Sequence, residues 1–380
     1  MAISMKPSNY TTNSNVMKTV MMKTAVGAMR AMYVPFKALR VKTRIAFISR
    51  QTDRPTEDIR MLSDCIRKKR PDAECVVLSR KLEGTNPVAY GFHMLRQMKY
   101  LATSSVVVLD GYCIAASVLE HKQETIVVQM WHALAAIKRF GYQALDMPSG
   151  RSSETARIMR MHRNYDFVVA PGEETGRFYC EAFDVGPEKL RYYGLPRVDL
   201  IKTEDEAFAA EVRREYGFDD GREVILYAPT FRKGRKVDAG PVIRAAEKEG
   251  FHIVVKLHPL YDDGSDYVDR KYSSYEWLKV CDRVITDYSA IGVEAALTGK
   301  PVYFYTYDIE EYREEIGLNI DPETEMPWAA ARNTESLEEL LREQYDSDKE
   351  KAFLDKYISV PTDRCTERLA DFLIGLLDRR

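Results

Sequence analysis

The chain has 380 residues, of which 45% are hydrophobic and 30% are charged, and its net charge is −2. This length and apolar content suffice for two hydrophobic cores, which excludes a disordered chain. The nearly neutral charge also argues against bulk binding of nucleic acid. Six cysteines are scattered without a CxxC pair, which argues against a zinc site or a disulfide framework and fits a reducing compartment.

The first 52 residues form a basic arm, because they contain nine Lys or Arg and no Asp or Glu. Apolar residues recur there every three or four positions: Met17, Met21, Ala25, Met29, Met32, Phe36 and Leu39. This stripe predicts an amphipathic helix with basic residues beside it, which Pro35 should kink or end at Val34. Such a helix suits an anionic membrane surface, and packing of the stripe on the protein body is the alternative. No apolar run is long enough for a transmembrane helix.

Beyond the arm, short β-branched strands alternate with helical segments. The first group has predicted strands at Thr43–Ser49, Ala73–Ser79, Ser104–Asp110, Glu124–Trp131 and Asp166–Ala170, and a helix at Glu57–Lys69. The second group has strands at Arg222–Thr230, Phe251–Pro259, Arg283–Ser289 and Pro301–Asp308, and helices at Ala290–Thr298 and Thr366–Leu377. Strands that are apolar on both faces and separated by helices predict parallel sheets covered on both sides.

A charged stretch at 202–222 contains Gly217 and Gly221 and marks a boundary between the two groups. The predicted fold class is therefore α/β, with two doubly wound, Rossmann-like domains. We place the basic segment at 1–40, the N-terminal domain at 41–205 and the C-terminal domain at 206–380.

Four polar clusters follow predicted strands, which is where open α/β sheets bind their ligands. The first contains Trp131 and His132, with Lys138 and Gly141 downstream. A His at a cleft mouth suits general-base work because its pKa is near neutral. The alternative is a packed His that caps a helix.

The second and third clusters end two strands of the C-terminal group. In YAPTFR, Thr230 can bind phosphate and Arg232 offers a fork of donors to phosphate oxygens. In KLHP, His258 comes just after a strand and is followed by a rigid proline. A surface turn with a solvated Arg, and a structural His, are the respective alternatives.

The fourth cluster is a strand, a polar turn and a helix, with Asp287, Tyr288 and Ser289 at the turn. The helix N-terminus offers N–H groups to an anion, and Glu294 could reach ribose hydroxyls. The alternative is that Asp287 or Ser289 simply caps the helix. No dinucleotide fingerprint, Walker A loop, GxSxG elbow or Asp-rich cluster occurs, so the predicted site uses no metal and no cofactor.

Together these clusters resemble the CDP-glycerol glycerophosphotransferase family of wall teichoic acid synthesis. The matching words are WHA with its downstream Lys and Gly, YAPTFR, KLHP and TDYSAIGVEAALTGKPVYFYTYDIEEYREEIGL, within Ile126–Leu318. Two positions depart from the family pattern, since Ala133 replaces a usual Gly and Glu294 a usual Asp. The resemblance implies a glycosyltransferase-B fold with the CDP-polyol on the C-terminal domain and the acceptor on the N-terminal one. The short chain is more similar to the primase members than to the long polymerases.

The resemblance also implies a reaction in which an acceptor hydroxyl attacks the β-phosphorus of CDP-glycerol and CMP leaves. His132 then corresponds to the general base, and His258 is the second catalytic residue. The implied CDP-glycerol contacts are Thr230, Arg232, His258, Asp287, Ser289 and Glu294. Trp131 and Lys138 are expected on the acceptor side.

The implied partners are CDP-glycerol or CDP-ribitol, a polyprenyl-diphosphate-linked saccharide acceptor and an anionic membrane surface, without nucleic acid. A peripheral location on the cytoplasmic face of the cell membrane follows, and a homo-oligomer is left open. A CDP-ribitol-dependent transferase and a nucleotide-sugar glycosyltransferase of the same fold are the enzymatic alternatives. A non-catalytic membrane-associated scaffold is the alternative from another class.

Overall fold

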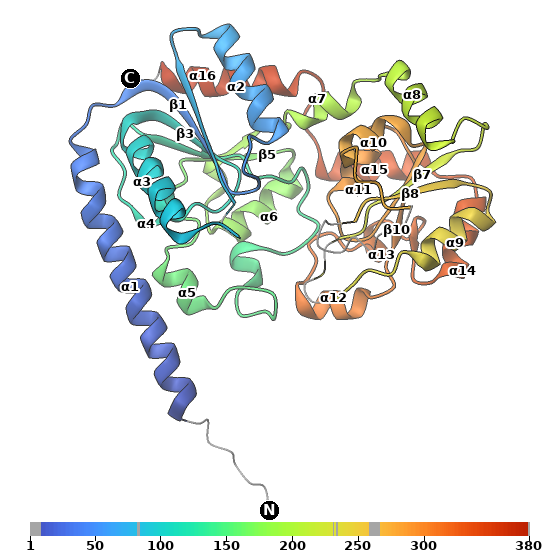
Figure 1. Ribbon diagram of the computed structural model, residues 1–380, viewed down its shortest axis with the longest axis horizontal. Coiled ribbons are helices and arrows are strands. Elements are labelled where there is room, and N and C mark those ends of the chain that lie inside the picture. The colour runs from blue at the N-terminus through green and yellow to red at the C-terminus, as the bar shows by residue number, and fades with distance from the viewer. Residues whose placement is uncertain (1–8, 82–83, 231, 233–234, 258–266, 379–380) are drawn as a thin grey trace, which may run out of the picture.

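The computed structural model describes residues 9–81, 84–230, 232, 235–257 and 267–378, with side chains from residue 16 onwards (Figure 1). Two parallel β-sheets, each flanked by helices, lie side by side. The predicted α/β class with two doubly wound sheets is therefore confirmed. The inner strands of both sheets are almost entirely buried because helices cover both faces of each sheet.

The first sheet has six strands in the order β2-β1-β3-β4-β5-β6. Their bounds are β1 Lys42–Ser49, β2 Glu74–Ser79, β3 Ser104–Leu109, β4 Ile126–Gln129, β5 Phe167–Ala170 and β6 Leu190–Tyr192. The helices of this half are α2 Glu57–Lys69, α3 Pro87–Thr103, α4 Ile114–Val118, α5 Ser153–Ile158 and α6 Glu173–Phe183, with short 3-10 turns η1 Gly141–Ala144 and η2 Pro187–Lys189. The strand order reverses between β1 and β3, which makes that point a switch point.

The second sheet has five strands in the order β11-β10-β9-β7-β8. Their bounds are β7 Val224–Tyr227, β8 His252–Val255, β9 Arg283–Thr286, β10 Val302–Tyr305 and β11 Ala330–Ala331. The helices are α7 Arg197–Lys202, α8 Glu206–Tyr216, α9 Gly240–Lys248, α10 Ser274–Val280, α11 Ile291–Ala296, α12 Ile309–Glu315, α13 Pro322–Glu325, α14 Thr334–Arg342, α15 Ser347–Tyr357 and α16 Cys365–Leu377. Here the order reverses between β7 and β9.

The last helix crosses back from the second half to the first. α16 packs against α2, β3 and α7, and its apolar face, including Leu369 and Leu373, is buried. Figure 1 shows it lying over the first sheet beside α2. The domain limits 41–205 and 206–380 stay a prediction, and this helix is the part of 206–380 that completes the other core.

The N-terminal helix α1 spans Asn9–Lys37 and projects beyond the body of the protein (Figure 1). It continues through Pro35 to Lys37, so of the two expected effects of Pro35 an end at Val34 is not observed, and a kink stays a prediction. Pro35 has no backbone N–H to donate to the carbonyl of Ala31, so the last turn of α1 forms without that hydrogen bond. None of the helices in the described part of the chain is long and apolar enough to cross a membrane.

The predicted apolar stripe of α1 is divided between two environments. Met29 and Phe36 pack against the core, together with the buried Val26 and Tyr33. The other stripe positions, Met17, Met21, Ala25, Met32 and Leu39, are exposed. The C-terminal half of α1 is thus a packed helix, which agrees with the alternative interpretation of the stripe, whereas its N-terminal half keeps an uncovered apolar surface.

Candidate active site

The two loops at the switch point of the second sheet are joined by direct hydrogen bonds. Thr230 follows β7 and Asp287 follows β9, and the Thr230 backbone N–H donates to Asp287 Oδ1 at 2.8 Å. Asp287 is almost fully buried and also accepts the Tyr288 N–H. The predicted phosphate-binding loops therefore lie together, as the carboxyl ends of neighbouring parallel strands must.

Arg232 is buried in the same group and is held by two carboxylates. Its Nη1 donates to Asp287 Oδ2 at 2.7 Å, and its Nη2 donates to Asp308 Oδ1 at 2.9 Å. Rings of Tyr288 and Tyr312, stacked with centroids 4.0 Å apart, lie beside the guanidinium. A phosphate ligand at Arg232 therefore has to compete with two buried carboxylates. The observed contacts show that the Arg232 side chain holds the loops after β7, β9 and β10 together.

Lys138 reaches this group from the first half of the chain. An antiparallel bridge joins it to Leu318, and the Asn319 side chain donates to the Lys138 carbonyl at 3.2 Å. Its Nζ lies 5.8 Å from the Tyr312 ring centroid and has neither an ion pair nor a hydrogen bond within the described residues. Burial lowers the pKa of Lys138 to about 8, although Asp287 opposes the shift. Lys138 therefore lies beside the predicted donor cluster rather than apart from it.

His132 lies past the end of β4 in the first sheet. Its Nδ1 is 2.9 Å from the carbonyl oxygen of Asp110, the residue that follows β3. Because a carbonyl only accepts, Nδ1 carries the proton and Nε2 is left with its lone pair. Burial, with added repulsion from Arg197 and Lys138, lowers the pKa of His132 to about 4. This value is below the near-neutral one expected from the sequence, and the imidazole is neutral at physiological pH.

A buried ionic network lies close to His132 and joins the two halves. Arg197, at the start of α7, has its Nε 2.8 Å from Asp58 Oδ2 in α2 and its Nη1 3.0 Å from Glu294 Oε1 in α11. The hydroxyl of Tyr275 lies 2.6 Å from the same Nη1. Glu294 is therefore engaged by Arg197, and burial raises the pKa of its carboxyl group.

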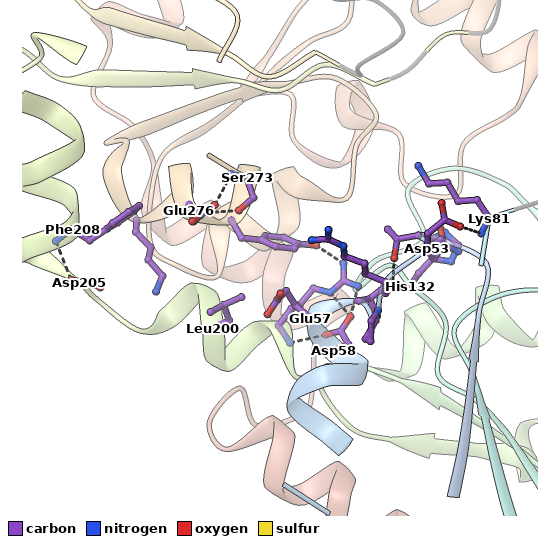
Figure 2. Close-up of a pocket in the computed structure, with 18 residues that line it drawn as sticks. Asp53, Glu57, Asp58, Lys81, His132, Leu200, Asp205, Phe208, Ser273 and Glu276 are labelled. Carbon is purple, nitrogen blue, oxygen red and sulfur yellow. Dashed lines mark hydrogen bonds and ion pairs between the residues drawn. The ribbon is translucent and has the colours of Figure 1, made fainter. Parts of the chain in front are cut away.

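A cavity of about 940 Å³ opens between these elements and is called the His132 cavity here. Its walls come from the β1–α2 loop, α7, α8 and α10, with His132 at one end (Figure 2). Figure 2 shows His132 near Asp53 and Lys81, and Phe208 and Asp205 at the opposite end. The volume fits a substrate of nucleotide or disaccharide size.

The remaining predicted residues are placed as follows. Trp131 adopts a left-handed φ of 61°, its ring stacks on that of Phe140 with centroids 4.6 Å apart, and its backbone N–H donates to Gln129 Oε1. Ser289 Oγ lies 3.5 Å from the Ile291 N–H at the start of α11. His258 lies outside the described residues. Among the described residues, no group of three or more His, Cys, Asp or Glu could hold a metal ion.

Sequence reasoning missed Asp58, Arg197 and Asp308 as parts of the site. Asp58 follows β1, Arg197 follows β6 and Asp308 follows β10. Each lies past the carboxyl end of a parallel strand, the same criterion that selected the other clusters. The short β6 was not predicted, so Arg197 had no strand to mark it.

Comparisons with known proteins identify the family of the chain. The chain matches the family CDP-Glycerol:Poly(glycerophosphate) glycerophosphotransferase over residues 31–375. A teichoic acid ribitol-phosphate primase of Bacillus spizizenii is 28% identical over 385 residues, which cover 95% of this chain and 99% of the relative. A teichoic acid glycerol-phosphate primase of Bacillus subtilis is 25% identical over 320 residues, 81% of each chain.

Solved structures show the same fold. The wall teichoic acid polymerase TagF, in a variant soaked with CDPG, superposes with a TM-score of 0.72 at 18% identity, over 98% of this chain and 99% of that one. A UDP-GlcNAc 2-epimerase of Methanocaldococcus jannaschii superposes with a TM-score of 0.53 at 15% identity, over 87% of this chain and 99% of that one. The family match covers most of the chain, which therefore belongs to the CDP-Glycerol:Poly(glycerophosphate) glycerophosphotransferase family.

Proposed function

We propose that this enzyme transfers glycerol phosphate from CDP-glycerol to a hydroxyl group of a lipid-linked saccharide acceptor and releases CMP, in teichoic acid synthesis. The acceptor oxygen forms a bond to the β-phosphorus while the bond from that phosphorus to the bridging oxygen breaks. The acceptor proton passes to a base of the protein, and the leaving CMP carries the bridging oxygen.

The observation that carries the proposal is the tautomer of His132 and its position at the cavity. Its Nδ1–H donates to the Asp110 carbonyl, so the unprotonated Nε2 is available as a base at the border of a large cavity. The lowered pKa keeps the ring neutral near pH 7, and it also makes Nε2 a weaker base than an ordinary imidazole. A hydroxyl group in the His132 cavity would meet that nitrogen.

On the donor side, we assign stabilisation of the phosphate charge to Lys138 and to the loops that contain Thr230 and Asp287. The Lys138 ammonium has no counter-ion within the described residues, and it faces the loops of Thr230 and Asp287. Neutralising the charge that develops on the phosphate of the leaving CMP is usually the largest contribution in phosphoryl transfer. We assign this role to Lys138, with Arg232 and Ser289 shaping the loops around the phosphates. The role of His258 as a diphosphate ligand stays a prediction.

CDP-ribitol is the second candidate donor. The relative that matches nearly the whole chain, at 95% coverage, is a ribitol-phosphate primase. Glycerol and ribitol differ in length and in the number of hydroxyl groups, so the size of the polyol end of the site decides between them.

Release of CMP tests the proposal directly. The purified chain is incubated with CDP-glycerol, CDP-ribitol or a UDP-sugar, each with a polyprenyl-diphosphate disaccharide acceptor. We expect CMP and an acceptor heavier by one polyol phosphate with one of the CDP donors. Release of UDP alone would instead support the nucleotide-sugar glycosyltransferase, and no turnover with any donor would support a non-catalytic scaffold.

A peripheral place at the cytoplasmic face of the membrane is part of the proposal. It is supported by the exposed apolar residues Val16, Met17, Val20 and Met21 near the projecting end of α1, with Lys18 and Lys23 among them. Apolar side chains and lysines on one projecting helix match an anionic bilayer surface.

A further inference from the structure

A second cavity, of about 290 Å³, lies beside Trp131 and is called the Trp131 cavity here. Rings of Trp131, Phe140 and Tyr112 line it, together with Arg139 and Arg151. Its volume is close to the lower end of the roughly 300–1,000 Å³ typical of small-molecule sites. The cavity is separate from the His132 cavity and has no role in the function proposed above.

Both arginines line the cavity and are exposed to solvent, and each has one nearby contact. The Arg151 guanidinium lies 5.4 Å from the centroid of the Tyr112 ring. The Arg139 backbone N–H donates to the Gly317 carbonyl at 3.0 Å. Gly317 has a φ of 80°, and a Cβ there would lie 2.8 Å from Arg139 Cδ, so this glycine leaves room for the arginine side chain.

Neither guanidinium group has a hydrogen bond or an ion pair within the described residues. Glu315, the acid next to the cavity residue Ile316, is engaged by the Ser149 hydroxyl at 2.7 Å. Each guanidinium presents five N–H donors in a planar fork that matches phosphate oxygens. Two exposed arginines without acidic partners among the described residues line one small cavity, and their planar donor forks favour a phosphate ligand.

The backbone of the cavity is held in an unfavourable conformation. Trp131 and His162 both line it and both have left-handed φ angles, of 61° and 58°. Non-glycine residues in this region cost free energy and gather at binding sites. Burial and the nearby charge of Arg151 lower the pKa of His162 to about 3, so this imidazole is neutral and the cavity charge comes from the arginines.

The Trp131 cavity also lies beside the proposed base. The ring centroids of Trp131 and His132 are 4.3 Å apart. We propose that this cavity binds a phosphate group of the acceptor, with Arg139 and Arg151 on its oxygens and the aromatic walls against the attached polyol or sugar. The inference rests on the proposed transferase function, because it places the acceptor hydroxyl next to His132.

The test compares two soluble acceptors with wild type and the Arg139→Gln/Arg151→Gln double variant. One acceptor is a disaccharide diphosphate with a short alkyl tail, and the other is the same disaccharide as a neutral alkyl glycoside. We expect wild type to prefer the diphosphate, and we expect the double variant to lose about tenfold or more in kcat/KM with it, mainly through KM. Transfer to the neutral acceptor and CDP-glycerol affinity should not change.

Arg157→Gln is the matched control, because Arg157 is an exposed arginine on α5 that does not line the cavity. It should behave as wild type. An unchanged preference for the diphosphate in the double variant would overturn the proposal. So would an equal loss with both acceptors at an unchanged Tm, because the arginines would then not act on the diphosphate.

Two further measurements separate the sources of the phosphate and the two proposals. Phosphatidylglycerol vesicles test a lipid headgroup, and loss of vesicle binding without loss of acceptor preference would overturn the assignment to the acceptor. Calorimetric binding of the alkyl disaccharide diphosphate needs no turnover. If wild type releases no CMP yet binds this probe and the double variant does not, the transferase proposal fails while the phosphate site stands.

Discussion

At the scale of single residues, His132 has its tautomer and its charge set by its neighbours. Replacing it with Ala should lower turnover by about 100-fold or more, because the loss of a general base has that size. CDP-glycerol binding should barely change, since no donor contact is assigned to His132. Single-turnover transfer and calorimetric donor binding measure the two effects, and near-normal turnover would rule out the role.

The lowered pKa of His132 also predicts a pH profile. The base works in its neutral form, so activity should fall only as pH drops through about 4. The profile of kcat/KM should therefore be flat between roughly pH 5 and 7, with circular dichroism confirming the folded state at each pH. An acid limb near 6.5, the ordinary value for His, would show that the ring is not desolvated in the working enzyme.

Lys138 and Arg232 should respond to substitution in different ways. Arg232→Ala leaves Asp287 and Asp308 buried without a counter-ion, which should cost about 3–5 kcal/mol of unfolding free energy and lower Tm. Lys138→Met removes a cation without an ion-pair partner among the described residues, so Tm should be maintained while donor affinity drops. Wild-type affinity for CDP-glycerol should also fall as pH rises past about 8, where Lys138 loses its proton, and Lys138→Met should not show this fall.

Part of the site could be predicted from local sequence, because residues that follow parallel strands converge at one sheet edge. Thr230 and Asp287 were both selected this way, and they are hydrogen-bonded. The partner of Arg197 could not be predicted, since Asp58 lies 139 positions away. The two residues come together only in the folded chain, where α2 and α7 both pack against α16. Likewise, the sequence around Arg232 does not indicate that its guanidinium group is already paired with two carboxylates.

At the scale of elements, the sequence predicts where most strands lie but not the residues at which they begin and end. The predicted strand Glu124–Trp131 is observed as Ile126–Gln129, because the chain leaves the sheet at the left-handed Trp131 although the residues there remain apolar. β6 and β11, with three and two residues, are too short for any periodic pattern. The helix at Glu57–Lys69 was predicted with its observed bounds.

The split character of α1 changes how its membrane role should be tested. Deletion of residues 1–40 also removes the buried Val26 and Tyr33, so it would weaken the core along with any anchor. Replacing Val16, Met17, Val20 and Met21 with Ser removes only exposed apolar surface. This variant should lose co-sedimentation with phosphatidylglycerol liposomes while Tm and CDP-glycerol binding are maintained.

High salt should weaken the binding of wild type, because each lysine near the surface adds about 1 kcal/mol of screened attraction. Tyr192→Ser, a change at an exposed aromatic residue on β6, is the control and should bind liposomes as wild type does. Undiminished sedimentation of the four-Ser variant would show that another surface is the anchor.

At the scale of the whole molecule, Arg197 connects the two halves beside His132, the proposed base. Arg197→Met should leave Asp58 and Glu294 buried and unpaired, which costs about 3–5 kcal/mol and lowers Tm. Adding Asp58→Asn and Glu294→Gln removes those charges and should restore much of Tm. Transfer should remain slow in the triple variant because the halves have lost their ionic connection. If both Tm and the transfer rate recover fully, the three charges only offset the free-energy cost of burying one another, and they have no role in transfer.

The return of α16 to the first sheet sets an order for folding in the cell. The ribosome finishes the six strands of that sheet long before it makes residues 365–377, and until then the surface of α2 and β3 that α16 covers is open to water. At typical synthesis rates the wait from residue 205 to the end is roughly 10 to 30 s. A nascent chain with an exposed apolar surface for that time is a natural client for chaperones, and the first half alone should not complete its core.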